Sequence, residues 1–318
     1  MRISQLLVTS LPFVLTLTLP AQDTFDWGAE GFNLFTLEDA TYIYSDVEGS
    51  VAIGGDFYSP LGGTSIGNML PSGRQDPALV VGGDLTWGGY GGDIFGEAYV
   101  GGTVVQVPGY FSISGSLPSD FYFAQKSAQL LGLNAAIANE VANASAAIAH
   151  STLTLSGDKS TDNILNLSSA LFNDANSVSF EFDNLALDAV IVLNIDGSET
   201  GGYLNLSGGW FTNDILPEQV LINLVNVSRL DMYGIGMVGS ILAPGTDVYF
   251  NGQMNGQLIA RSLYSYDGYT TGELHDYRFR GFVPAVPEPS TAIPVVGSVL
   301  LTLLLVFRKR LLKWISRG

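Results

Sequence analysis

Three stretches of this chain each end a short apolar run with a pair of glycines. They are residues 51–57 (VAIGGDF), 79–85 (LVVGGDL) and 98–104 (AYVGGTV), and the glycines are Gly54, Gly55, Gly82, Gly83, Gly101 and Gly102. The first glycines of the three pairs are 28 and 19 residues apart. Glycine adopts positive φ readily, so each pair is predicted to turn the chain sharply into another strand. A strand and a glycine corner about every 20 residues is typical of a β-solenoid, in which each coil packs on the next.

The second half of the chain contains further strand-like runs of the same kind. Residues 239–243 (GSILA) and 256–260 (GQLIA) repeat a glycine-led strand with a spacing of 17 residues, which favours the solenoid. An antiparallel sandwich with glycine-rich hairpins is the alternative. Residues 189–193 (AVIVL) are apolar on both faces, as expected for a strand buried between parallel neighbours or under a helix. Other predicted strands are residues 178–182, 220–225, 230–233, 248–250 and the remainder of 189–195.

Between these two halves the period changes to that of a helix, predicted over about residues 119–144. Ser119 or Asp120 can cap it, after Pro118. A stripe at spacings of three and four, rich in alanine, would let the helix lie close against the side of the solenoid. Its members are Phe121, Ala124, Ala128, Leu131, Ala135, Ala138 and Ala142.

Charge limits the partners of this chain. Residues 22–285 contain 29 acidic side chains against seven basic ones, which leaves a formal charge of −22. Such a surface repels nucleic acid, so phosphate backbones are excluded as partners. The chain has no cysteine, which excludes a disulfide-stapled scaffold, thiol catalysis and cysteine-bound metal.

Both ends of the chain have the pattern of targeting segments. Residues 1–21 are predicted to be a secretory signal peptide, with Arg2, an apolar run and the small Ala21 at its end. Residues 292–307 are an uncharged apolar run of 16 residues, and the basic cluster Arg308, Lys309 and Arg310 follows directly. An apolar span before basic residues predicts a transmembrane helix and a tail held on the cytoplasmic side, over residues 292–318. The segment between, 283–291, is a linker.

The C-terminal segment resembles the PEP-CTERM sorting signal of Gram-negative bacteria. The resemblance rests on Pro287, Glu288 and Pro289 standing just before the apolar run and the basic cluster. It implies an exosortase-type processing protease as a partner, transient anchoring in the inner membrane, and delivery to the outer envelope, cell surface or extracellular matrix. An ordinary tail-anchoring helix behind a proline-rich linker is the alternative.

Residues 22–282 resemble the choice-of-anchor A domain. The similar segments are residues 46–56, 239–244 and 255–260, followed by 272–277. The resemblance implies an adhesive extracellular domain with no assigned catalytic residue, whose glycine-punctuated coils and single helix are similar to those of ice-binding β-solenoids.

Few residues of this chain are candidates for catalysis or ligand binding. Glu273 and His275 form the densest polar cluster; they are interpreted either as an acid/base pair or as side chains on one face of a strand that close the last coil. Calcium is a second hypothesis, for which Asp183, Asp188 and Asp196 are candidate ligands. Aromatic side chains can fill the core or stack on sugar rings; the candidates are Tyr42, Tyr44, Trp87, Tyr90, Trp210 and Phe211.

The sequence therefore predicts a mainly β protein, a right-handed parallel β-solenoid with one long flanking helix. We expect an exported, non-enzymatic protein that is adhesive or structural and that binds exopolysaccharide or another matrix polymer, without a cofactor other than calcium. A carbohydrate- or ice-binding module is one alternative, which an aromatic-rich or threonine-rich ladder on one face would favour. A polysaccharide-active β-helix enzyme is another, which would show carboxylates clustered in a groove.

Overall fold

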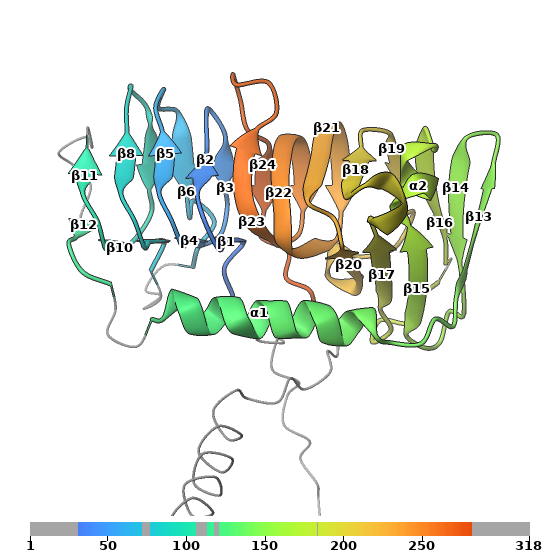
Figure 1. Cartoon of the computed structure of the whole chain (residues 1–318). Coiled ribbons are helices and arrows are strands. Elements are labelled where there is room, and N and C mark those ends of the chain that lie inside the picture. The colour runs from blue at the N-terminus through green and yellow to red at the C-terminus, as the bar shows by residue number, and fades with distance from the viewer. Residues whose placement is uncertain (1–30, 72–76, 106–112, 118–120, 183, 282–318) are drawn as a thin grey trace, which may run out of the picture.

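The computed structural model describes residues 31–71, 77–105, 113–117, 121–182 and 184–281 (Figure 1). The predicted signal peptide, the sorting motif Pro287 to Pro289 and the basic cluster Arg308 to Arg310 lie outside this range. None of the helices in the described part of the chain has the length and apolar character needed to cross a membrane.

Parallel coils stacked in register form the body of the molecule. One long strand shows their shape: β22 (Ser240–Asn255) pairs along its first, middle and last thirds with different neighbours, because it bends across three faces of one coil. With about 4.8 Å between strands, the stack is roughly 40–50 Å long. The predicted parallel β-solenoid is confirmed, and the antiparallel sandwich is wrong.

The face covered by the long helix is called the helix face. Along the stack its strands are β12 (Ile113–Ser114), β10 (Ala98–Val100), β7 (Leu79–Val81), β4 (Val51–Ile53), β1 (Leu34–Thr36), β23 (Leu258–Ser265), β22, β20 (Val220–Val225), β17 (Ile191–Asp196) and β15 (Asn163–Ser168).

A second face is called the tyrosine face. Its strands, in the same direction along the stack, are β11 (Val104–Val105), β8 (Leu85–Trp87), β5 (Phe57–Ser59), β2 (Ala40–Thr41), the later parts of β23 and β22, β21 (Arg229–Val238) and β18 (Tyr203–Leu206). The short helix α2 (Ser169–Asn173) packs beside β18.

The remaining face, called the third face, consists of two sheet segments. The first contains β9 (Gly92–Ile94), β6 (Thr64–Ile66), β3 (Asp46–Val47), β24 (Glu273–His275) and the ends of β22 and β21. The second contains β19 (Gly209–Phe211), β16 (Ser177–Glu181), β14 (Thr152–Ser156) and β13 (Ser145–Ala149). Trp210 Nε1 donates to the carbonyl oxygen of Val238 at 3.1 Å and so bridges the segments. Two 3₁₀ turns, Ser198–Thr200 and Pro217–Gln219, complete the elements.

The order of coils along the stack differs from their order in the chain. The chain starts in the middle of the stack at β1 and winds outward to β12 (Figure 1). The helix α1 (Phe123–Ala138) then carries it back along the helix face to the opposite end. From there the coils return to the middle, where β23 pairs with β1 through Leu34 and Leu258. This pairing is called the central junction.

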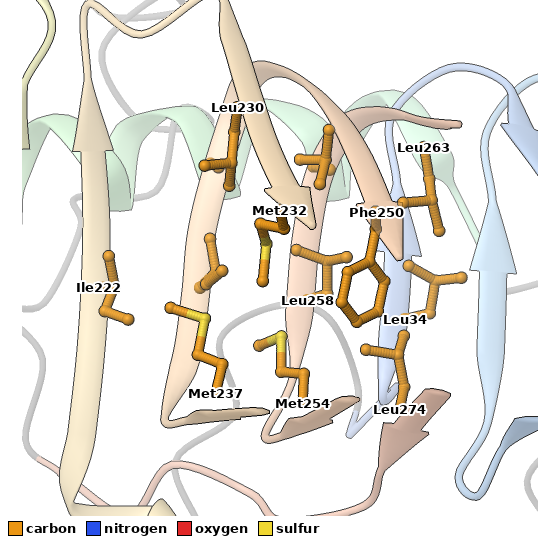
Figure 2. Close-up of a cluster of buried hydrophobic side chains, with 14 of the residues drawn as sticks. Leu34, Ile222, Leu230, Met232, Met237, Phe250, Met254, Leu258, Leu263 and Leu274 are labelled. Atoms are coloured by element: carbon orange, nitrogen blue, oxygen red, sulfur yellow. The ribbon is translucent and has the colours of Figure 1, made fainter. Parts of the chain in front are cut away.

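Buried apolar side chains fill the interior of the coils. Figure 2 shows part of this core, in which Leu34, Leu258, Leu263 and Leu274 come from both sides of the central junction. All four side chains are fully buried. Because adjacent coils are in register, each interior side chain lies on the equivalent one of the next coil, which gives a continuous core along the stack.

The glycine pairs stack on one another at the corner between the helix face and the tyrosine face. A Cβ added to Gly82 would lie 2.4 Å from the carbonyl oxygen of Gly54, and one added to Gly101 would lie 2.6 Å from that of Gly82. A Cβ added to Gly83, the second glycine of its pair, would lie 2.2 Å from Asp56 Oδ1. Neither these residues nor their partners Gly55 and Gly102 have positive φ. Glycine is therefore required here by the close approach of neighbouring coils, and the predicted reason, positive φ, is wrong.

Aspartates stabilise the same corner: Asp56 and Asp84 follow glycine pairs, and Asp39 occupies the equivalent position after Leu37 and Glu38. The backbone N–H of Asp56 donates to Asp39 Oδ1 at 2.8 Å, and that of Asp84 donates to Asp56 Oδ1 at 2.7 Å. The backbone N–H of Thr103 donates in turn to Asp84 Oδ1. Each carboxylate thus accepts a backbone donor from the next coil, which satisfies a corner N–H that the strand ladder leaves free.

The helix α1 is shorter than predicted and presents a different side to the sheet. It runs from Phe123 to Ala138, and its N-cap is Tyr122, not Ser119 or Asp120. Leu130, Leu133 and Ile137 are buried against the outward side chains of the helix face. The predicted alanine stripe is mainly exposed, and Leu131 within it is 48% exposed. The larger side chains win because their burial removes more apolar surface from water.

Three asparagines on adjacent strands fix the end of α1 to the sheet. Asn223 Nδ2 donates to Asn194 Oδ1, and Asn194 Nδ2 donates to Asn166 Oδ1, both at 2.9 Å. Residues 223, 194 and 166 are paired across β20, β17 and β15, so their side chains form a ladder. This ladder was not predicted, although its members are 28 and 29 residues apart in the sequence.

The same amides also donate to carbonyl oxygens at the end of the helix. Asn223 Nδ2 donates to the carbonyl oxygen of Asn134 at 3.1 Å, and Asn194 Nδ2 donates to that of Ile137 at 2.9 Å. Asn166 Nδ2 donates to the carbonyl oxygen of Glu140, just beyond α1. The carbonyl oxygen of Ile137 also accepts the backbone N–H of Glu140, so the ladder adds second hydrogen bonds that hold the last turn of α1 against the sheet.

We predict that Gly82→Ala destabilises the protein by about 1–3 kcal/mol, because its Cβ would overlap the backbone of the neighbouring coil. Denaturant unfolding of the purified protein measures this. The matched control is Gly236→Ala, because no atom lies within 4 Å of a Cβ built there. Equal stability of the two variants would contradict the role of close approach.

We predict that Asn194→Asp costs about 2–3 kcal/mol of stability at pH 7, because a buried carboxylate would face the Ile137 carbonyl oxygen instead of donating to it. Burial and this carbonyl raise the pKa of the new carboxyl above its usual value of about 3.9. The protonated variant can still donate, so the deficit should be small below about pH 4 and grow as the pH rises. Thermal unfolding of both proteins across pH measures the difference; a deficit independent of pH would contradict it.

Candidate functional site

The tyrosine face carries one in-register row of outward side chains. Strand alternation directs Phe57, Leu263 and Val248 into the core and the residue after each of them outward. The row passes from coil to coil through paired residues, except that Thr41 and Tyr264 follow directly after the paired Ala40 and Leu263. Its members are Val105, Thr86, Tyr58, Thr41, Tyr264, Tyr249, Asp231 and Asn205. It crosses the central junction between Thr41 and Tyr264, so both halves of the chain contribute to one surface.

Aromatic rings on this face stack along the axis of the solenoid. The ring centroids of Tyr249 and Tyr264 are 5.2 Å apart with 31° between the ring planes. Tyr233 and Tyr266, nearer the corner with the third face, form a second pair at 5.0 Å. Because each ring packs against the next coil, the stacked pairs present ring edges and hydroxyl groups to solvent. The unpaired ring of Tyr58 is 49% exposed.

Every cation described on the tyrosine face is held by a carboxylate of the same face. Arg229 Nε donates to Asp231 Oδ1 at 2.8 Å, and its guanidinium lies 4.1 Å from the ring centroid of Tyr249. Arg261 forms a bidentate pair with Asp247. These pairs leave the row without net charge, in a body whose formal charge is −22.

Tyr203 completes the polar end of the row. Its hydroxyl donates to Asp231 Oδ2 at 3.2 Å. Partial burial, together with the negative charge and the hydrogen bond of Asp231, raises the pKa of the Tyr203 hydroxyl. The phenol therefore stays protonated and remains a donor at neutral pH.

The third face is acidic where it crosses the central junction. Asp93, Asp46 and Glu273 occupy equivalent outward positions on β9, β3 and β24. Glu273 Oε1 lies 3.4 Å from His275 Nε2, and Glu273 Oε2 accepts a hydrogen bond from Gln253. His275 Nδ1 lies within hydrogen-bonding distance of Asn255 Oδ1. The structure thus places Glu273 and His275 side by side on β24, between β22 and β3.

The calcium candidates do not meet. Asp183 lies outside the described residues, and Asp188 is exposed in a loop. Asp196 Oδ1 accepts hydrogen bonds from the backbone and hydroxyl of Ser198 and from Asn226, and these bonds lower the pKa of Asp196. Within the described ranges, no three acidic or histidine side chains gather closely enough to hold a metal ion.

A cavity of about 330 Å³ lies beside the end of α1. Its lining combines the asparagine ladder with polar and apolar side chains: Ala138, Asn166, Leu167, Ser168, Asn194, Asp196, Glu199 and Val225. Ser168 Oγ donates to Glu199 Oε2, and the amides of the ladder are engaged by the helix.

The aromatic candidates divide between core and surface. Tyr42 and Trp87 are fully buried, and Trp210 is nearly so. Burial raises the pKa of Tyr42 well above its usual value, and its hydroxyl donates to the carbonyl oxygen of Asp46. Tyr44, Tyr90 and Phe211 are exposed, but none belongs to the row.

The row itself was not among the sequence predictions. Tyr58, Tyr249 and Tyr264 each stand in a strand directly after a buried apolar residue, in FYS, VYF and LYS. That pattern marks an outward tyrosine on a strand. The pattern was visible, but the alignment of three such strands across the central junction was not.

Comparison with known proteins gives a family match. The sequence profile of the family described as "Putative Ice-binding-like adhesive domain" matches residues 27–276. Among solved structures, the chain is similar to an ice-binding protein domain of Shewanella frigidimarina, with 13% identity, coverage of 79% of this chain and 95% of that chain, and a TM-score of 0.36. It is also similar to an ice-binding protein from an Antarctic biological consortium, with 16% identity, coverage of 83% and 96%, and a TM-score of 0.34. No curated protein matches the chain.

We predict that the Arg229–Asp231 pair has a coupling free energy of about 1 kcal/mol, since Asp231 is buried but the Arg229 side chain is 49% exposed. Asp231→Asn alone should destabilise the protein, because it leaves the guanidinium without its carboxylate. In Arg229→Gln/Asp231→Asn part of this loss should be recovered. A double-mutant cycle of unfolding free energies measures the coupling, and strictly additive losses would contradict it.

Proposed function

The chain belongs to the family of ice-binding-like adhesive domains, and on that premise we propose that it is a non-enzymatic surface adhesin. In this proposal the tyrosine face binds a neutral polysaccharide of the extracellular matrix. The observation that carries the proposal is the in-register row of tyrosine and threonine side chains on a face where each arginine is paired.

The chemistry of the row suits a polymer of repeated hydroxyl groups. Phenol and threonine hydroxyls both donate and accept hydrogen bonds, and they occupy five successive positions of the row, from Thr86 to Tyr249, about 4.8 Å apart. Tyrosine also offers apolar ring surface at low conformational cost. The paired charges favour a neutral polymer, because an acidic polymer would be repelled by the rest of the body.

Two alternatives are less well supported by the same face. A threonine-rich ladder on one face would favour ice binding, but here Thr41 and Thr86 are separated by the bulky Tyr58. For a glycosidase, two carboxyl groups must be free to act as acid and base or nucleophile. The acids of this face, Asp231 and Asp247, are both held by arginines.

The ends of the described chain support a model of delivery. Phe32 and Phe279 both belong to the apolar cluster that contains Leu130, Leu133 and Ile137 of α1, so the described chain begins and ends near the helix face (Figure 1). We propose that the protein is a choice-of-anchor A-type adhesin, exported through the signal peptide 1–21. Its C-terminal PEP-CTERM segment would then hold the helix side toward the inner membrane of a Gram-negative bacterium until an exosortase-type protease acts. The tyrosine face would stay free for the matrix.

We predict that the protein sediments with insoluble neutral polysaccharides, tested as suspensions of cellulose, mannan and chitin. Replacing two members of the row, in Tyr58→Ser/Tyr264→Ser, should weaken this binding by about tenfold, roughly 1.4 kcal/mol. The control is Tyr122→Ser, because Tyr122 is 59% exposed but lies at the start of α1. The proposal would be rejected if the protein bound none of the three polymers. It would also be rejected if Tyr122→Ser lost as much binding as the double variant.

A further inference from the structure

The strand β13 forms an open edge at one end of the stack (Figure 1). It pairs with β14, and its residues Ser145, Ala147, Ile148 and Ala149 are exposed. The five residues SAAIA include no charge and no proline. Solenoids and sheets usually protect such edges with charge, proline or a bulge, so an uncharged open edge is a surface on which another strand can add.

The hairpin that carries β13 determines which backbone groups are free. His150 and Ser151 have φ of 49° and 61°, as in a two-residue type I′ turn. In such a hairpin the pair that flanks the turn, Ala149 and Thr152, is hydrogen-bonded, and the bonding alternates from there. The N–H and C=O groups of Ala146 and Ile148 therefore point away from β14, toward the open edge.

We propose that this edge pairs with the β13 edge of a second copy of the chain, antiparallel and with the two-fold axis at Ala147. The free groups of Ala146 and Ile148 are placed symmetrically about Ala147. Ala146 of one copy would therefore face Ile148 of the other, and each such pair would form two hydrogen bonds. The edge is complementary to itself in this register, and a one-residue shift would lose the match.

Side chains and charge support the same register. Ala146 and Ile148 lie opposite the buried Leu155 and Leu153, on the core side of the hairpin. Pairing would place the isoleucine of each copy beside the small alanine of the other, over the open end of the core. An uncharged segment is also where two bodies of formal charge −22 can approach with least repulsion.

The pairing itself does not depend on the proposed function, but its consequence does. The two-fold axis is perpendicular to the third face, so the third faces of the two copies would be continuous and their tyrosine faces would point in different directions. A strand pair this short is a small and weak interface. A paired adhesin would be bivalent, however, and could hold two polymer chains with a gain in avidity.

Cysteine cross-linking of the full chain tests the register, because the native chain has no cysteine. At the two-fold axis, residues 147 of the two copies would form a non-hydrogen-bonded pair about 4.5 Å apart, within reach of a disulfide. Ala147→Cys should therefore give a covalent dimer on mild oxidation, detected by non-reducing electrophoresis. Ala149→Cys is the matched control, since its two copies would be roughly 14 Å apart.

Two further measurements separate pairing from chance collision. A mixture of Ser145→Cys and Ala149→Cys chains should form the mixed dimer, because these positions face each other in the proposed register. In Ala146→Pro/Ala147→Cys the proline removes an N–H that points away from β14, so the hairpin keeps its own bonds while the cross-link is lost. Circular dichroism verifies the fold. No dimer with Ala147→Cys, equal yields at 147 and 149, or an undiminished yield in the folded proline variant would overturn the proposal.

Discussion

The close approach of one coil to the next at the glycine corners is the constraint on which the rest of the structure depends. At Gly82 and again at Gly256, a single added carbon would overlap the carbonyl oxygen of the neighbouring coil. Backbone contact at the corner leaves little freedom for adjacent coils to shift. The carboxylates of Asp39, Asp56 and Asp84 reinforce it by accepting N–H groups from coil to coil. The register that is fixed at the corner also determines which residues of neighbouring coils face each other in the core, in the asparagine ladder and in the tyrosine row.

The general architecture could be predicted because short sequence repeats specify it. A Gly-Gly pair after an apolar strand marks a corner whatever the chain does elsewhere, and the parallel pairing of Leu79 with Val51 and Ala98 follows from it. The reason assigned to the glycines was wrong because backbone conformation and close approach select the same residue. The helix was found at the correct place, but spacing alone could not decide between its alanine stripe and the side with Leu130, Leu133 and Ile137.

The candidate site could be predicted only in part, because it depends on contacts between residues distant in the sequence. Tyr58 and Tyr264 belong to one row only because β2 and β23 pair across the middle of the stack. Hydrophobicity could not separate Tyr42, which lies in the core, from Tyr249, which lies outside it. Similarly, Asn194 and Asn223 look like ordinary polar residues in apolar strands until the end of α1 is placed beside them.

The central junction also sets the order in which the molecule can be completed during biosynthesis. Leu34 is made early, but its partner Leu258 and the strand β24 are made near the end of the described chain. Until these strands are made, the first coils have an unpaired edge and cannot reach their final stability. Pairing at such sequence separation is slow to form. For the export proposed above, this delay is useful, because secretion requires an unfolded chain and the early coils cannot complete their fold before the last strands are made.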